Sequence, residues 1–313
     1  MNYAGIDIGS RTIEVVVINQ SGDIIESRQS DTTFDPISES IKLLDGIEYE
    51  RILATGYGRT LFEIAHDNLD NDAKIMTVTE IKAHARGAQA FFPDVSTILD
   101  IGGQDSKAIA INGKGRVKKF EMNDRCAAGT GKFLEIMAKT LGFTVESFGR
   151  EALEAKNALT INSMCTVFAE SEVTSLIAKG AVPREIALGL HVSVMKRAVA
   201  MLNRVRMPVK NLRDLKEAIS TQKASDDQKE RCAQKERCAQ KERDTHNERA
   251  TQEKRGQEGK TDNHGENIVF TGGVANNPCM IKLISEKLGC EILVPENPQM
   301  VGALGAALLA GEQ

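Results

Sequence analysis

The sequence predicts an α/β protein of two domains, and three observations support this prediction. Runs rich in β-branched residues alternate with stretches of helical spacing, which is typical of sheets covered by helices. The chain has 313 residues, of which 41% are hydrophobic, so it can bury two cores. A glycine turn follows a β-rich run three times, at 7–12 ("DIGSRT"), 100–107 ("DIGGQDSK") and 271–278 ("TGGVANNP").

The first part of the chain contains a hairpin pattern that occurs twice. Strands are predicted at 3–8, 12–18 and 23–29, followed by a helix near 36–45, a strand at 51–55 and a helix at 78–90. Residues 96–112 repeat the opening pattern of strand, glycine turn and strand, and "KGRVKKFEM" at 114–122 predicts a further strand.

The second part of the chain is mostly helical in pattern. Helices are predicted at 129–141, 166–179 and 183–205, and the last of these is long and amphipathic. After residue 265 the pattern predicts a strand at 267–271, a helix at 279–289, a strand at 290–294 and a final helix at 299–310.

Residues 221–265 differ from the rest of the chain. They hold 11 Lys or Arg and 10 Asp or Glu in 45 positions, and "QKERCA" occurs at 228–233 and again at 234–239. Such a segment cannot bury a core, so we interpret it as a charged low-complexity insert, either disordered or a frayed, solvated helix. We attribute its cysteines, Cys232 and Cys238, to the duplication rather than to a ligand set.

Composition and charge argue against nucleic acid and membrane partners. The formal net charge is -4, Trp is absent and aromatic residues make up 4% of the chain, which does not favour a base-stacking surface. The N-terminus lacks a basic segment followed by an apolar one, so no signal peptide is predicted. The most apolar run, at 300–311, is shorter than the ~18 residues that a membrane span needs. We therefore expect a cytoplasmic protein.

The three glycine turns suggest a phosphate site. Glycine lets backbone N–H groups approach phosphate oxygens, and an Asp at the end of the preceding strand, Asp7 or Asp100, can hold Mg²⁺ through water. One such turn alone is as readily an ordinary strand connection, whereas three together favour a nucleotide site. "GTGK" at 129–132 is not a P-loop, because Phe133 stands where Ser or Thr is required, and the Rossmann spacing is absent.

Two cysteines share a local context. Cys126 and Cys165 each precede a predicted helix, where a thiolate gains from the helix N-terminus. Each could equally be a small buried hydrophobic residue, as free Cys often is. No pair of cysteines forms CxxC, and two thiolates cannot complete a four-ligand site within one chain. A symmetric dimer would supply four on its two-fold axis.

With these turns the sequence resembles the actin-like, sugar-kinase-like ATPase superfamily. The resemblance implies two α/β domains with ATP between them: 1–94 plus 297–313 with the first phosphate loop, and 95–296 with the second. It implies that Asp7 and Asp100 flank Mg²⁺ and that Gln104 orients the attacking water. The implied contacts to ATP or ADP are Gly9, Ser10, Arg11, Thr12, Gly102, Gly103, Gly129, Gly131, Gly272, Gly273 and Asn276.

A narrower resemblance rests on "NDRCAAGTGKFLE" at 123–135 and "NSMCTVFAESEV" at 162–173. These segments are similar to the two cluster-ligand segments of the ATPase activators of 2-hydroxyacyl-CoA dehydratases, and of the related benzoyl-CoA reductase subunits. "ATGYGR", "TEIKAHARGA", "LDIGGQDSK" and "VFTGGVANN" match the same family. The resemblance implies that Cys126 and Cys165 of two subunits hold one [4Fe-4S] cluster per homodimer. Cys279 and Cys290 match no such segment and are interpreted as structural.

The activity implied by this resemblance is ATP-driven electron transfer. An electron from ferredoxin or flavodoxin would pass through the cluster to a dehydratase or reductase component, with ATP hydrolysis giving the transfer its direction. A small-molecule kinase of the same fold, such as an amino-sugar kinase with Asp105 or Glu80 as base, is the alternative, and an ATP-gated binding module is a third. Neither of these needs the paired cysteines.

Overall fold

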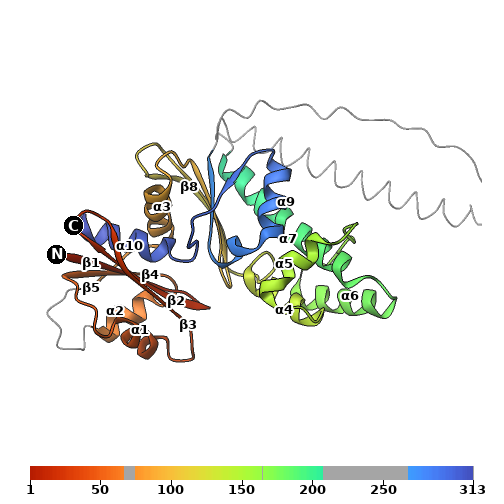
Figure 1. Cartoon of the computed structure of the whole chain (residues 1–313), viewed down its shortest axis with the longest axis horizontal. Coiled ribbons are helices and arrows are strands. Elements are labelled where there is room, and N and C mark those ends of the chain that lie inside the picture. Colours follow the sequence, from red (N-terminus) through yellow and green to blue (C-terminus); the bar gives the residue numbers. More distant parts are fainter. Residues whose placement is uncertain (67–74, 164, 207–266, 313) are drawn as a thin grey trace, which may run out of the picture. The chain divides into compact units, whose positions relative to one another are not determined.

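The structure, a computed structural model, describes residues 1–66, 75–163, 165–206 and 267–312. The predicted charged insert at 221–265, with Cys232 and Cys238, lies outside the described residues. Within them the chain forms two mixed five-stranded sheets with associated helices, which confirms the predicted α/β class (Figure 1). No helix in the described ranges is long and apolar enough to span a membrane.

The first sheet has the strand order β3-β2-β1-β4-β5. β1 pairs antiparallel with β2, β2 antiparallel with β3, and β1 and β5 each pair parallel with β4. Its strands are β1 (Asn2–Ile8), β2 (Thr12–Asn19), β3 (Ile24–Asp31), β4 (Arg51–Thr55) and β5 (Ile75–Thr77). The helices of this part are α1 (Pro36–Leu44), α2 (Arg59–His66), α3 (Glu80–Phe91) and α10 (Val301–Gly311).

The second sheet repeats this plan with the order β10-β9-β6-β7-β8. Again three strands form an antiparallel meander, and two more are added in parallel beside its first strand. The strands are β6 (Thr97–Ile101), β7 (Ser106–Ile111), β8 (Val117–Asn123), β9 (Ile268–Thr271) and β10 (Ile292–Leu293). The hairpin pattern that the sequence shows twice is thus the opening of two similar sheets.

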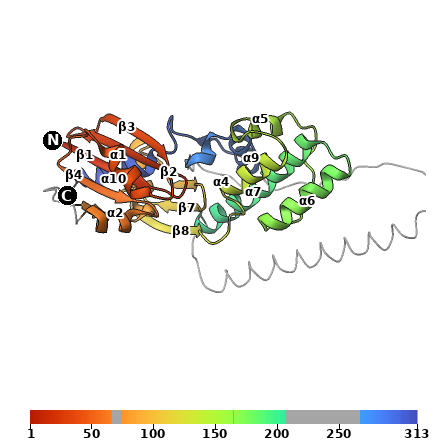
Figure 2. The same cartoon turned by 90° about the horizontal axis from the view of Figure 1, so that it is seen from below.

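Most remaining helices belong to the same part of the chain as the second sheet (Figure 2). They are α4 (Gly131–Thr140), α5 (Val145–Leu153), α6 (Thr166–Ala178), α7 (Pro183–Arg206), the 3₁₀ turn η1 (Gly273–Asn276) and α9 (Pro278–Leu288). The long helix α7 contacts β6, β7 and β8 on one side and α4, α5, α6 and α9 on others, so it forms the centre of the second core.

The C-terminal helix α10 is held tightly against β1, β2, β4 and α3. Its sequence "VGALGAALLAG" consists of small and aliphatic residues, and almost all of them are buried. Gly5 of β1 lies so close to α10 that a Cβ there would collide with the backbone at Ala303 and Ala307. Small residues on both elements therefore allow the contact between their backbones.

Three elements were not predicted from the sequence: α2, α5 and β5. α5 begins with an N-cap that the sequence carries, because Thr144 Oγ1 accepts a hydrogen bond from Ser147 N at 3.2 Å. β5 has only three residues, which is too short for a periodic pattern to reveal.

Candidate functional site

The three glycine turns lie around one cavity of about 840 Å³. The first turn joins β1 to β2, the second joins β6 to β7, and the third follows β9. The fold brings thirteen of the predicted site residues, which are spread over nearly 270 positions of the sequence, to this cavity. Those that line it are Asp7, Gly9, Ser10, Arg11, Thr12, Asp100, Gly102, Gly103, Gln104, Gly131, Gly272, Gly273 and Asn276.

The first two turns have the same hydrogen bond. Gly9 N donates to Thr12 O and Gly102 N donates to Asp105 O, both at 3.0 Å. A Cβ on Gly103 would come within 2.7 Å of the Cβ of Arg11, so the tips of the two turns meet across the cavity. The exposed backbone of two opposed hairpin tips is suited to hold a chain of phosphates between them.

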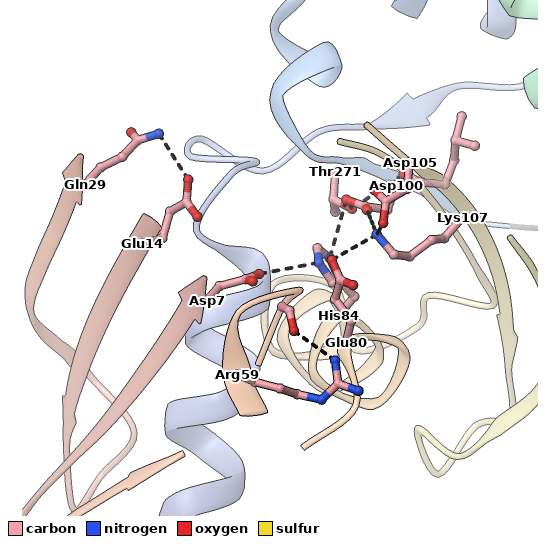
Figure 3. Close-up of polar contacts among 12 residues, drawn as sticks. Asp7, Glu14, Gln29, Arg59, Glu80, His84, Asp100, Asp105, Lys107 and Thr271 are labelled. Carbon is pink, nitrogen blue, oxygen red and sulfur yellow. Dashed lines mark hydrogen bonds and ion pairs between the residues drawn. The ribbon is translucent and has the colours of Figure 1, made fainter. Parts of the chain in front are cut away.

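A buried lysine, Lys107, is the centre of the charge cluster at the base of the cavity (Figure 3). Its Nζ lies 3.1 Å from Asp100 Oδ2, 2.8 Å from Asp105 Oδ2 and 3.0 Å from Glu80 Oε1. Burial lowers the pKa of Lys107, but the three carboxylates outweigh it and hold the pKa well above its usual value. Lys107 is therefore a fixed cation that joins α3 to the second turn.

The two predicted magnesium carboxylates differ in their surroundings. Burial alone would raise the pKa of Asp100, but His84, Lys107 and a 2.9 Å hydrogen bond from Thr271 Oγ1 lower it to about 2. The pKa of Asp7 is raised well above its usual value by burial and by the neighbouring Glu80 and Glu14. One carboxylate is thus ionised before any cation arrives, whereas the other favours its proton.

His84 lies between these two carboxylates. Its Nε2 is 3.8 Å from Asp7 Oδ2 and its Nδ1 is 3.5 Å from Asp100 Oδ1, which are contacts too long for good hydrogen bonds. Both Asp7 Oδ1 and His84 Nδ1 are buried without a hydrogen-bond partner. Oxygen and nitrogen atoms of Asp7, Glu80 and His84 lie within 4.8 Å of one another. Buried, unsatisfied carboxylate oxygens are the ligands that Mg²⁺ takes, so the residues present fit this cation.

The far wall of the cavity is formed by η1, α5 and the residues before α10. Gly272 has φ +82 and lies against the backbone of Ile101, a position that only glycine fills without strain. Asn276 Nδ2 donates to Gln299 Oε1 at 3.4 Å. The apolar part of this wall was not predicted from the sequence; it comes from Val145, Phe148, Gly149, Val274 and Pro278.

One charged network and two backbone hydrogen bonds connect the glycine turns to α4. Arg11 NH1 lies 3.2 Å from Glu135 Oε1, and Lys132 Nζ lies 3.3 Å from the same oxygen. At the start of α4, Gly131 N donates to Gly102 O at 2.9 Å and Lys132 N donates to Gly103 O at 2.8 Å. The helix α4 therefore begins on the backbone of the second glycine turn.

The predicted cluster cysteines and Gly129 do not line the cavity. Cys126 and Cys165 are both exposed free thiols, whereas Cys279 is buried. Cys165 is the N-cap residue of α6, and Cys126 precedes the first residue of α4 by five positions. Since α4 and α6 contact each other, the two thiols lie just ahead of two neighbouring helices. Gly129 lies between Cys126 and α4 with φ +92, so its observed place is in the turn that carries the thiol.

Both thiol-bearing segments are held by side chains from elsewhere in the second part. Asn123 Nδ2 donates to Cys126 O at 2.9 Å and to Ala128 O at 3.2 Å. The carboxylate of Glu172 on α6 accepts from Asn162 N at 3.0 Å and from Ser163 N at 2.8 Å, just ahead of Cys165. The two exposed thiols are therefore carried by segments whose backbones are hydrogen-bonded in place.

Comparison with known proteins identifies the family of this chain. The BadF/BadG/BcrA/BcrD ATPase family matches residues 4–211.

The chain belongs to the BadF/BadG/BcrA/BcrD ATPase family.

Its relatives in this family include dehydratase activators. The activator of lactoyl-CoA dehydratase of Anaerotignum propionicum is 33% identical over 328 residues, covering 100% of this chain and 98% of the relative. The solved structure of the activator of the 2-hydroxyisocaproyl-CoA dehydratase from Clostridium difficile, with bound ADPNP, is 31% identical, with a TM-score of 0.72 over 100% of this chain and 95% of that one. Component A of the Acidaminococcus fermentans (R)-2-hydroxyglutaryl-CoA dehydratase is 30% identical, with a TM-score of 0.74 over 100% and 98%.

These matches confirm the predicted family and fold. A ROK family glucokinase from Streptomyces griseus also superposes, with a TM-score of 0.55 at 11% identity, which shows the shared actin-like fold alone. Lys107 and His84 lie within the family segments "LDIGGQDSK" and "TEIKAHARGA", but nothing in the sequence indicated that they face the two aspartates.

Proposed function

We propose that this BadF/BadG/BcrA/BcrD family member hydrolyses ATP to drive one-electron transfer to a 2-hydroxyacyl-CoA dehydratase or a related acyl-CoA reductase. The observation that carries the proposal is the direct backbone connection between the second phosphate turn and the helix that follows Cys126. The activators to which the chain is similar along its whole length support the same assignment.

The nucleotide is proposed to lie between the two hairpin turns. The N–H groups around Gly9, Ser10 and Arg11 would contact its phosphates from one side, and those around Gly102 and Gly103 from the other. Asp7 and Asp100 would hold Mg²⁺, whose charge offsets the burial of Asp7. The exposed side chain of Gln104 at the tip of the second turn can both donate to and accept from an attacking water.

A [4Fe-4S] cluster needs four thiolates, and this chain offers two exposed ones in the described residues. Cys126 and Cys165 therefore fit a cluster only if a second copy of the chain supplies the other pair, so we propose a homodimer with one cluster. When bound, the cluster supplies a low-potential one-electron centre. The side chains of Val167 and Phe168, at the start of α6, are largely exposed and would be covered in such a dimer.

The residues of the chain suggest how nucleotide and thiols communicate. A phosphate near Arg11 would compete with Glu135 for its guanidinium, and would press on the turn whose carbonyls hold the first amides of α4. Any shift of that turn must therefore reach α4, and with it the segment held by Asn123. We propose domains at 1–94 plus 297–313 and at 95–296; the two separate five-stranded sheets support this division. Ferredoxin or flavodoxin is the proposed electron donor.

The proposal is tested by purification without oxygen, followed by iron analysis and measurement of mass in solution. We expect a brown dimer with about four irons per two chains. Cys126→Ser and Cys165→Ser should each lose the iron and retain binding of the ATP analogue ADPNP, whereas the control Cys290→Ser should keep both. A colourless monomer that phosphorylates an amino sugar would contradict the proposal and favour the kinase.

A further inference from the structure

A second cavity, of about 380 Å³, lies on α3 and shares no lining residue with the nucleotide cavity. Three elements meet at it: α3, the turn between β7 and β8, and the end of α10. Four of its lining side chains are cations, two from α3 and two from the turn. They are Lys82 and Arg86 on the helix, and Lys114 and Arg116 in the turn.

The positive charge of this pocket is mostly uncompensated. Its one acidic lining residue is Glu312, whose Oε1 lies 2.7 Å from Arg86 Nε. Among the described residues, no carboxylate forms an ion pair with Lys82, Lys114 or Arg116. The chain as a whole has a net charge of -4, so this concentration of cations is a local feature. Four cations around a small hollow repel one another, and a multivalent anion would relieve that repulsion.

The turn that supplies two of the cations has a defined conformation. Asn112 Oδ1 accepts hydrogen bonds from Lys114 N at 3.0 Å and from Arg116 N at 2.9 Å, and Gly115 N donates to Asn112 O at 2.8 Å. Gly115 has φ +70, which favours glycine, and lies directly against the side-chain amide of Gln89 of α3. The backbone that carries Lys114 and Arg116 is thereby fixed beside the helix.

We propose that this pocket is a binding site for a small phosphorylated anion, of the size of diphosphate or a compact phosphate ester. Its volume is at the lower end of the range for small-molecule sites, so the anion must be compact. Lys and Arg together suit phosphate oxygens, because Arg donates in a bidentate fork and Lys supplies a point charge. The hollow shape favours a small ligand over the flat surface of an acidic protein.

The site is separate from the nucleotide cavity but is built on the same helix. Glu80 and His84 of α3 line the nucleotide cavity, whereas Lys82 and Arg86 line the pocket. A test must therefore keep the nucleotide cavity occupied, both to stop diphosphate from binding between the phosphate turns and to hold α3 in one state. Calorimetry on the purified full chain, saturated with ADPNP and Mg²⁺, meets this need. Protein-free titrations correct for chelation of the magnesium.

We expect sodium diphosphate to bind at one further site per chain under these conditions. The variant Lys114→Gln/Arg116→Gln should bind it at least about tenfold more weakly, since two of the charged contacts are lost. The control Lys139→Gln/Lys156→Gln has the same change of net charge at exposed positions outside the pocket and should bind within about twofold of the parent chain. Circular dichroism verifies that both variants are folded.

Three results would overturn the assignment. One is the absence of any further diphosphate site in the saturated protein at about 50 mM salt, where electrostatic contacts are strongest. Another is an equal loss of affinity in the two variants, which would indicate attraction by net charge alone. The third is binding of poly-glutamate without binding of diphosphate, which would assign the pocket to an acidic polypeptide.

Discussion

Replacing Lys107 by Met should be among the most destabilising single changes at the candidate site. The Lys107 side chain is 1% exposed and contacts the carboxylates of Asp100, Asp105 and Glu80 at 2.8–3.1 Å. Each pair has a gross attraction of about 5 kcal/mol at an effective dielectric constant near 20. Most of this is offset by the desolvation of the buried ammonium, so the net loss is smaller than the sum of the three pairs.

The loss of stability depends mainly on the carboxylates that Lys107→Met leaves without a cation. Removing one partner of a buried pair typically costs about 3–5 kcal/mol, which for a chain of this size lowers Tm by about 10 °C. Differential scanning fluorimetry measures this shift, with Lys156→Met as a control at an exposed position. Adding Glu80→Gln and Asp105→Asn to the variant should recover much of the loss, because fewer uncompensated charges remain buried. A Tm within about 2 °C of the parent chain would refute the view of Lys107 as an electrostatic centre.

Further predictions concern a glycine, a histidine and a glutamate. Gly302→Ala places a methyl group on Asp7 Oδ2 and should weaken binding of ADPNP with Mg²⁺ about tenfold or more, whereas Gly113→Ala, which meets nothing within 4 Å, should have no effect in the same titration. Burial lowers the pKa of His191 from 6.5 to about 4. The buried neutral imidazole therefore contributes its full stability above about pH 6.5, and about 3 kcal/mol of the free energy of unfolding is lost as the pH falls to about 4. His191→Gln should flatten this dependence in urea unfolding between pH 7 and pH 4, and an unchanged slope would exclude His191 as its source. Glu135→Gln removes the ion pair between Glu135 and Arg11 of the first glycine turn. Because an exposed ion pair is worth at most about 1 kcal/mol, the affinity for ATP should rise by no more than about fivefold. Weaker binding of ATP would contradict the view that Glu135 and a phosphate compete for Arg11.

Most of the long helices and the paired strands were predictable from the sequence. The strands of the two hairpins and the helices α1, α3, α6, α7 and α9 lie within a few residues of their predicted positions. These segments are long, rich in β-branched residues or bounded by clear stop signals, such as Gly289, which ends α9 in a left-handed conformation. The elements α2, α5 and β5 were missed because they are short: α2 has eight residues, α5 nine and β5 three, although α2 and α5 are amphipathic.

The glycine turns of the candidate site were predictable from the sequence, but its charge cluster was not. Glycine turns after strands can be read from the sequence, because each is a local feature of a few residues. The cation Lys107 and the bridging His84 are different: they act only through carboxylates from other elements, and the sequence does not show which faces of β7 and α3 meet. The unequal pKa values of Asp7 and Asp100 arise from this same long-range arrangement, although both follow a β-run and precede a glycine turn.

The stretch at 123–135 shows how a local pattern can point to two functions at once. Its glycines and Lys132 suggest a phosphate loop, and Cys126 suggests a metal ligand. In the structure Gly131 N and Lys132 N donate to the carbonyls of the second phosphate turn, so these amides are already used and cannot cradle a phosphate themselves. The segment instead connects two features: Gly131 and Lys132 are bonded to the second glycine turn, and Cys126 presents an exposed thiol. Under the proposed function, a link of this kind would carry a displacement from the nucleotide to the cysteine segment without a direct contact between nucleotide and metal.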